Sequence, residues 1–170
     1  MELIDKIGQL LATLCCSIFA GASLYINLVE HPARMECGTE VAAREFAPSY
    51  RRAAIMQASL AILGFLASLL VWLRGNDVWW LVGGLLLVLV VPFTLIVIMP
   101  TNRKLLDPSL DKGSDATAKL FSKWAKLHAV RTCLSILALL IFHYIMTVHP
   151  LPPSPVSSNN YAPEKIQKRS

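Results

Sequence analysis

Charged residues are scarce in this chain of 170 residues. They make up 16% of the sequence, whereas a water-soluble domain usually carries about 25%. Hydrophobic residues make up 55%, and they are gathered into long runs rather than spread along the chain. The composition therefore leaves no core of the ordinary water-soluble type.

Motifs for common cofactors and metals are also missing. The four cysteines form no C-x-x-C pair and no Cys/His spacing of the kind that zinc sites use. The chain has no G-x-G-x-x-G stretch and no visible haem, flavin or nicotinamide motif. We therefore expect no disulfide framework and no bound cofactor. A metal site formed by Glu30, His31 and His128 is a less favoured alternative, because the ligand types suit a metal but their spacing does not.

Four apolar runs are the main feature that is present. They cover residues 7–29, 53–73, 78–99 and 129–148, about 20 residues each, and such a helix spans a hydrocarbon layer of about 30 Å. The first run is expected to be a span rather than a signal peptide, because residues 1–6 hold two acids against one lysine and the run continues beyond its small residues. The pattern predicts an all-α, integral membrane four-helix bundle over residues 1–149. The proline-rich tail at 150–170 is predicted to be disordered.

Prolines predict where the helices end. Pro32 is expected to stop the first helix at His31, and Pro100 to stop the third helix, because the residue before a proline is disfavoured in helical geometry. In the first long connection, a short interfacial helix over 39–47 would end at Pro48. Within the third span, Pro92 removes one backbone hydrogen bond and is expected to kink the helix.

Two other local patterns concern the second helix and the second long connection. Small and polar residues recur every three or four positions along the second helix, which predicts its bundle-facing side; they are Ala54, Gln57, Ala61, Gly64 and Ser68. In the second connection, Ser114 or Asp115 is expected to cap a helix that runs directly into the fourth span.

Basic residues are unevenly distributed between the two sides. The two long connections, at 30–52 and 100–127, lie on one side and hold ten lysines and arginines, whereas the other side holds five. This asymmetry predicts a multi-pass protein with both connections in the cytoplasm and both termini outside. The net charge of +5 is explained by interfacial residues beside the lipid bilayer, and no nucleic-acid partner is expected.

Polar residues gather at the four helix ends on the side of the long connections. On an ideal helix, the side chains of Trp124, His128, Arg131 and Ser135 fall within an arc of about 60°. The corresponding ends of the other helices add Asn27, Glu30, His31, Tyr50, Gln57 and Asn102. Ionisable groups inside a membrane bundle favour a functional site, because they are costly to keep there. The alternative is a set of polar helix ends that meet water, with Glu30 paired to Arg131.

Three stretches resemble a known family. They are FAGA at 19–22 with Tyr25, Asn27 and EHPAR at 30–34; PTN at 100–102 with Leu105; and Trp124 with LH at 127–128 and VR at 130–131. In this order and spacing they resemble the anthrone oxygenases, a family of small four-span membrane proteins. The resemblance covers about residues 7–148. It implies a membrane-bound oxidoreductase, a monooxygenase that oxidises an anthrone or similar polyketide-like aromatic compound with dioxygen as co-substrate.

A mechanism can be drawn with the residues of this chain. His128 would be the base, because histidine is the side chain that titrates near neutral pH. Arg131 would hold the resulting anion, and Glu30 would orient His31 or balance Arg131. Trp124 and Tyr50 would stack on a flat, lipophilic substrate, and Asn27, Gln57 and Asn102 would complete its binding site.

A non-enzymatic protein is the alternative class. A four-span bundle could bind or carry a lipid-soluble small molecule, or serve as a structural membrane subunit. A binding or catalytic site needs a concave pocket among the helix ends. A structural subunit would instead show Glu30, His31 and Arg131 in one compact network without a void.

Overall fold

The computed structural model describes residues 2–148, which form four long helical rods and no strand in that range. The first rod joins α1 (Glu2–Tyr25), the π-helical turn η1 (Ile26–Glu30) and α2 (His31–Glu36). The second rod is α3 (Thr39–Leu73), and the third joins α4 (Trp79–Phe93), the π-helical turn η2 (Thr94–Ile98) and α5 (Met99–Leu105). The fourth rod is α6 (Asp115–Val148). The predicted tail at 150–170 lies outside the described residues.

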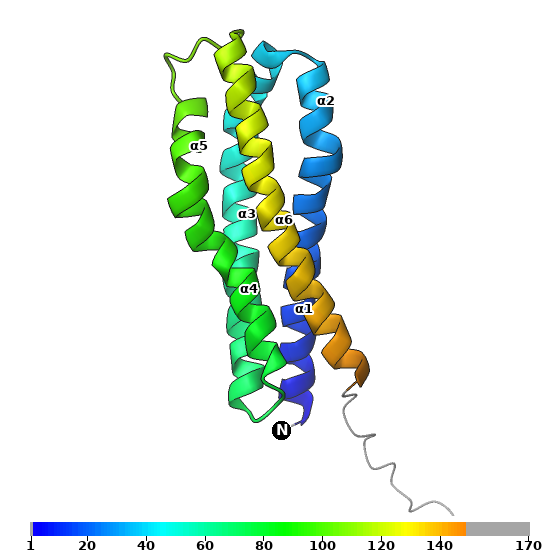
Figure 1. Cartoon of the computed structure of the whole chain (residues 1–170). Coiled ribbons are helices and arrows are strands. Elements are labelled where there is room, and N and C mark those ends of the chain that lie inside the picture. Colours follow the sequence, from blue (N-terminus) through cyan, green and yellow to red (C-terminus); the bar gives the residue numbers. More distant parts are fainter. Residues whose placement is uncertain (1, 149–170) are drawn as a thin grey trace, which may run out of the picture.

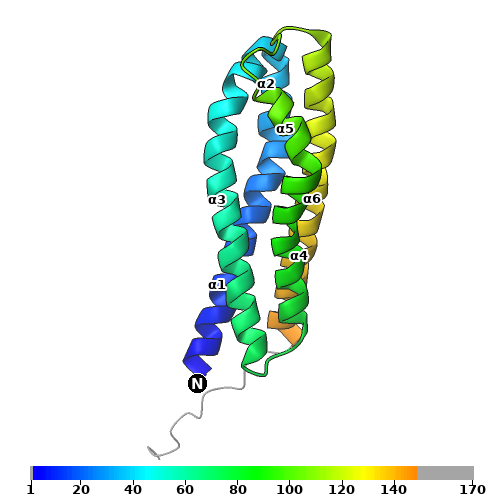
Figure 2. The ribbon, with the colours of Figure 1, turned by 90° about the vertical axis from the view of Figure 1, so that its left-hand side faces the viewer.

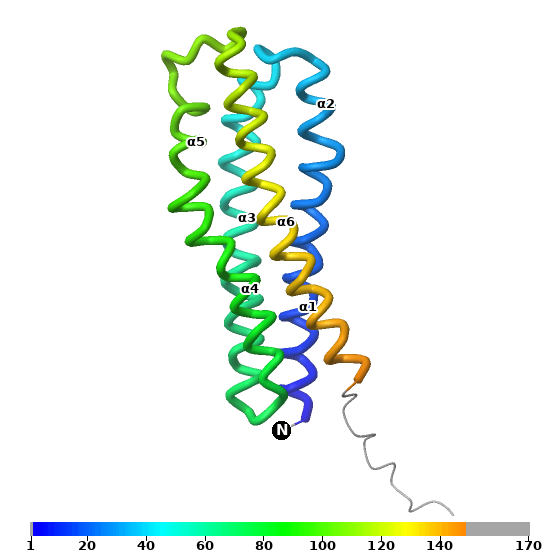
Figure 3. The backbone as a smooth tube through the Cα atoms, viewed as in Figure 1, coloured from blue at the N-terminus to red at the C-terminus, as the bar shows by residue number. Residues whose placement is uncertain are grey.

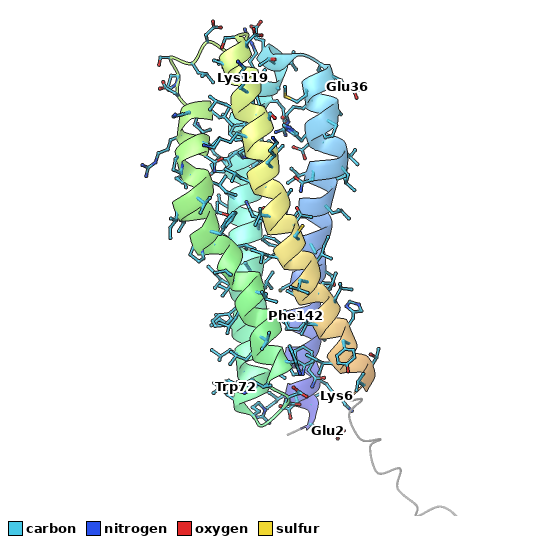
Figure 4. All side chains as sticks on the ribbon, in the orientation of Figure 1. Glu2, Lys6, Glu36, Trp72, Lys119 and Phe142 are labelled. Atoms are coloured by element: carbon cyan, nitrogen blue, oxygen red, sulfur yellow. The ribbon has the colours of Figure 1, made fainter. Side chains whose placement is uncertain are left out.

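The four rods pack side by side in one elongated bundle (Figure 1). Each rod is long and apolar enough to cross a membrane, so the chain is a multi-pass membrane protein, as its apolar runs predicted. We call the end with the two long connections the loop end, and the end with the short α3–α4 connection the turn end. Figure 4 places Glu36 and Lys119 near the loop end, and Trp72 and Phe142 near the turn end.

Prolines do not end the helices where the sequence predicted. The first and third rods continue beyond Pro32 and Pro100, because each proline lies in the first turn of a short helix, α2 or α5, where a backbone N–H is not required. In each rod a π-helical turn precedes that short helix, and the N–H of His31 bonds the carbonyl of Ile26. The π-helical turns thus let the rods carry a proline without stopping.

Pro48 also fails to end its helix. It lies inside α3, which runs without interruption from Thr39, and its ring is exposed on the outside of the bundle. One backbone hydrogen bond is lost there. The continued helix buries Phe46, which is 1% exposed, against α6, and this burial offsets the loss. The predicted interfacial helix is therefore an extension of the second span.

The bend predicted at Pro92 coincides with an irregular stretch of the third rod. Pro92 lies near the end of α4, and the π-helical turn η2 follows it directly. The hydroxyl of Thr94 donates to the carbonyl of Val90 at 2.6 Å. The tube in Figure 3 changes direction where α4 passes into α5.

Small residues bring the rods together, and the predicted small and polar face of the second helix is confirmed. Gln57, Ala61, Gly64 and Ser68 are all buried. A β-carbon built on Gly64 would lie 2.7 Å from the Leu87 side chain, so α3 and α4 approach closely at this level.

The fourth rod begins as predicted. The N–H of Thr117 bonds Oγ of Ser114 at 3.3 Å, which caps α6 at its start, and the helix runs on into the fourth span. At the turn end, Trp80 is 1% exposed and stacks on Phe142 with ring centroids 5.2 Å apart. Trp80 is therefore a core residue rather than an interfacial one.

Candidate functional site

A cavity of about 130 Å³ lies in the loop-end half of the bundle. All four rods contribute to its wall. The charged, polar and aromatic residues of the wall are Phe19, Glu30, Arg34, Phe46, Ser49, Tyr50, Gln57, Thr94, Asn102, Trp124, His128 and Arg131. A void is therefore present, and the compact network expected of a purely structural subunit is not.

His128 is buried and held from behind by a chain of hydrogen bonds. Its Nδ1 lies 2.8 Å from Oδ1 of Asn27, whose Nδ2 donates to Oγ1 of Thr132 at 2.7 Å. The Thr132 hydroxyl in turn donates to the Ser23 carbonyl at 3.3 Å. Because the Asn27 nitrogen donates to Thr132, it is the Asn27 oxygen that faces His128. An amide oxygen can only accept, so Nδ1 of His128 carries the proton. Nε2 then has a free lone pair, and no hydrogen-bond partner is found for it among residues 2–148.

Arg131 brings a positive charge to the cavity without a carboxylate to balance it. Its Nη2 donates to Oε1 of Gln57 at 2.7 Å, and its guanidinium lies 5.6 Å from the centroid of the Phe19 ring. In the described part of the chain, no acidic side chain lies within ion-pair distance of it. An unbalanced guanidinium in a water-poor cavity is an attractive partner for an anion.

Glu30 does not pair with Arg131. The sequence suggested this contact either as the charge balance of a catalytic arginine or as a structural ion pair, and the structure contains neither within residues 2–148. Its carboxylate forms an ion pair with Arg34, one helical turn away, and accepts a hydrogen bond from Ser49 at 3.1 Å. Arg34 is 8% exposed and also pairs with Glu45 at 2.6 Å. Glu30 is thus engaged at the loop-end margin of the cavity, and within residues 2–148 Arg131 has no carboxylate partner.

Aromatic rings form one wall. Trp124 stacks on the imidazole of His128, with ring centroids 4.8 Å apart and planes at 27°. Phe46 meets Trp124 edge-on at 5.5 Å and stacks on Tyr50 at 5.7 Å. Flat, rigid surfaces of this kind suit a planar aromatic guest.

His31 lies outside this wall. Its ring packs against Trp124 at 5.5 Å and Phe121 at 6.2 Å and does not line the cavity. A regular helix turns by 100° per residue and would place His31 beside the cavity, but a π-helical turn adds about one residue to a helical turn and rotates the side chains that follow it. The π-helical turn η1 comes directly before His31. The structure therefore brings His128 and Arg131 together but leaves His31 behind Trp124.

Asn102 is buried, with 1% of its surface exposed, and lines the cavity from α5. Neither its Nδ2 nor its Oδ1 has a hydrogen-bond partner within the described residues. Buried amides are nearly always hydrogen-bonded. The unpaired Asn102 amide therefore lowers the stability of the fold, and a ligand that bonds it would restore that free energy.

The metal alternative finds no geometric support. Over residues 2–148, no group of three His, Cys, Asp or Glu side chains could hold an ion. Glu30 is paired with Arg34, whereas His31 and His128 each pack a ring against Trp124.

Some residues of the site were not singled out by the sequence analysis. Arg34 could have been found from its position four residues after Glu30, which places both on one helix face. Thr132 and Ser23 carry ordinary helical spacing, and only their contacts across α1 and α6 show that they position His128. Phe46 was assigned to a connection, so its place in the wall was missed.

Fold and site together define a class of protein: a small multi-pass membrane bundle with a cavity between its spans. A family model described as anthrone oxygenase matches residues 46–141, which is more than half of the chain. The chain belongs to the anthrone oxygenase family, and membership indicates an oxygenase-like function. The matched segment contains six of the predicted site residues: Tyr50, Gln57, Asn102, Trp124, His128 and Arg131. Comparison with curated proteins and with solved structures gave no match.

Proposed function

We propose that this protein is a membrane-bound, cofactor-independent monooxygenase that oxidises the acidic methylene group of an anthrone-like aromatic compound with dioxygen. The observation that carries the proposal is the pairing, in one cavity, of an imidazole with a free Nε2 and a guanidinium without a carboxylate. A base and an anion-binding cation are the two groups that such a reaction needs from a protein.

The reaction divides into steps that the site can serve. Nε2 of His128 takes a proton from the methylene carbon, and the electron pair moves onto the ring carbonyl to give an enolate. Arg131 stabilises the enolate oxygen through its N–H groups. The electron-rich carbanion then adds to dioxygen, and the resulting peroxide anion takes the proton back from the His128 imidazolium to give a carbon-bound hydroperoxide. Loss of the second methylene proton breaks the O–O bond, so the carbon becomes a carbonyl and one oxygen atom leaves as water.

The size of the cavity bears on how a substrate would sit. An apolar cavity of about 150 Å³ encloses one benzene molecule. The cavity here, at about 130 Å³, therefore encloses about one ring of a three-ring compound. The reacting ring would lie beside His128 and Trp124, and the remaining rings would extend from the cavity.

Oxygen consumption by protein in lipid vesicles tests the proposal, with an anthrone as substrate and the quinone identified by mass spectrometry. We expect His128→Gln and Arg131→Gln each to lower the rate by about 10²-fold or more. A turn-end variant, Trp80→Phe, serves as the control for a change remote from the cavity. Wild-type rates in both cavity variants would contradict the proposal.

A carrier of lipid-soluble molecules is the second candidate, and the cavity supports it equally. The two candidates differ in turnover. A carrier would bind an anthrone tightly without consuming oxygen, and the quinone would not form above the rate seen in protein-free vesicles.

A further inference from the structure

The wall of the cavity is closed on some sides and open on one. On the sides of α1 and α6, Phe19, Trp124 and His128 are 0%, 6% and 2% exposed. Between α3 and η2, the lining residues are small or outward-facing: Ala58 is half-buried and Leu95 is 59% exposed. Leu95 is the one lining residue that is exposed rather than buried or half-buried, so we infer that the cavity opens between these two elements.

The backbone explains why the opening lies there. Toward the turn end, Gly64 and Gly84 on facing helices keep α3 and α4 in close contact. Beyond Pro92, the π-helical turn η2 redirects the third rod. Figure 2 shows α3 and the α4–α5 rod meeting at the turn end and lying farther apart at the middle of the bundle. The separation begins at the level where residues of η2 line the cavity.

The opening faces hydrocarbon rather than water. The exposed side chains around it are uncharged and mainly apolar, among them Ile55 at 73%, Leu95 at 59% and Ile96 at 73%, with Ser59 the polar one beside Ala58. The first charged residues on these rods come nearer the loop end, at 51–52 on α3 and 103–104 on α5. The opening lies on the turn-end side of these basic residues, within the apolar part of the spans, where an ion would be costly.

We propose that the gap between α3 and η2 is a lateral portal through which an uncharged planar aromatic compound, dissolved in the bilayer, reaches His128 and Arg131. Ala58 and Leu95 form its rim. The guest arrives neutral, because a charged one would not dissolve in hydrocarbon. Its conversion to an anion beside Arg131 rests on the proposed function, whereas its route does not.

Quenching of Trp124 fluorescence can report arrival in the cavity. Trp124 lines the cavity, whereas Trp72, Trp79 and Trp80 lie at the turn end. The probe is anthraquinone, a neutral quencher that dissolves in lipid, mixed rapidly with protein in vesicles. The part of the signal that disappears in Trp124→Phe is assigned to the cavity.

Matched substitutions test the rim. Ala58→Phe and Leu95→Phe place a ring in the opening, whereas Ser59→Phe and Ile96→Phe place the same ring one position away, on exposed residues that do not line the cavity. We expect the rim variants to slow Trp124 quenching by about tenfold, which corresponds to a barrier raised by about 1.4 kcal/mol. The neighbouring variants should behave as wild type. Circular dichroism and gel filtration of all four variants check that they fold.

Two results would overturn the portal. One is equal quenching rates in all four variants. The other is quenching of Trp124 by the water-soluble anthraquinone-2-sulfonate as fast as by anthraquinone, which would place the route in water. Oxygen consumption on the same vesicles separates this inference from the proposed function. Rim-dependent quenching without oxygen consumption removes the oxygenase reaction and keeps the portal, whereas oxygen consumption with equal quenching rates does the reverse.

Discussion

At the turn end, helices touch through glycine: a β-carbon on Gly8 would lie 2.8 Å from Val71, and one on Gly83 would lie 2.5 Å from the Phe142 ring. At the loop end, the same four rods surround a cavity of about 130 Å³. The two π-helical turns and Pro100 fall in the loop-end half of their rods, and Pro92 lies at the middle of the third rod. Regular helices with small residues close the bundle, and irregular helices open it.

Hydrogen bonding and ion pairing also differ between the two ends: polar groups are paired at the turn end, and some are left unpaired at the loop end. At the turn end, Asp5 pairs with Arg74, and the Gln9 amide donates to Asn76 at 3.3 Å. At the loop end, the described contacts leave Asn102 without a hydrogen bond and Arg131 without a carboxylate. Unsatisfied buried groups cost stability and persist where they serve a ligand. The comparison therefore predicts that turn-end changes alter stability and loop-end changes alter activity.

The largest difference between the effect on activity and the effect on stability is expected for His128→Gln. Glutamine keeps an amide donor toward Asn27 but has no basic nitrogen, so the rate of anthrone oxidation should fall by about 10²- to 10⁴-fold. The midpoint of thermal unfolding in detergent should stay close to that of wild type. A lowered midpoint together with the lost rate would mean that His128 supports the fold, which would contradict the prediction that loop-end changes alter activity alone.

Two arginines of the cavity wall, Arg34 and Arg131, should respond in opposite ways to the same change. Arg34→Met strands the carboxylate of Glu30 and should lower the free energy of unfolding by about 2 kcal/mol, less than for a fully buried pair because both acids are partly exposed. Arg131→Met removes a cation that has no carboxylate partner in the described structure, so stability should be unchanged or raised by about 1 kcal/mol while oxidation is lost. Chemical unfolding of both variants in the same micelles makes the measurement. Equal losses in the two variants would show that Arg131 is as structural as Arg34.

Glycine substitutions test close contact at the turn end. Gly83→Ala forces a methyl group against the Phe142 ring and should cost about 1–2 kcal/mol of unfolding free energy. Gly21→Ala is the matched control, because a β-carbon there meets nothing within 4 Å and alanine favours the helix by up to about 1 kcal/mol. Oxidation rates should be unaffected by either change. A stable Gly83→Ala variant would mean that the turn end is not closely packed.

The smallest effect is expected for Asn102→Leu. Replacing an unpaired buried amide with an apolar side chain of similar size should raise stability by about 1 kcal/mol. At the turn end, Asn76→Leu removes the amide that bonds Gln9 and the Val71 carbonyl at 3.0 Å, and it should lower stability by a similar amount. Thermal unfolding of the two variants side by side checks the sign of each change. A destabilised Asn102→Leu variant would show that this amide supports the fold.

Much of the site followed from sequence because it lies on regular helix. Trp124, His128 and Arg131 are on α6, which has no irregular turn, so an ideal 100° spacing placed all three on the cavity side. Gln57 was predicted to face the bundle from the small residues around it, and it is 2% exposed. His31 was misplaced, because the π-helical turn before it cannot be recognised from hydrophobic periodicity.

Pairing between charges could not be read from the sequence. Glu30 was expected to pair with Arg131, but Arg34, one turn away on the same rod, forms the ion pair with Glu30 instead. A local i,i+4 pair needs no tertiary contact, whereas a pair across helices depends on their separation. The orientation of the two long connections toward the cytoplasm stays a prediction from their basic residues.

The sequence by itself determined the number of spans, the face that each regular helix turns inward, and the end of the bundle that collects ionisable groups. These follow from the length of the apolar runs and the 3.6-residue period, which act locally. Only the tertiary structure decided that prolines continue rather than end the rods, that Arg131 has no carboxylate partner in the described chain, and that a cavity lies between the four rods. These depend on how four separate rods share space, because a proline, an ion pair or a void is tolerated or excluded by its neighbours in three dimensions.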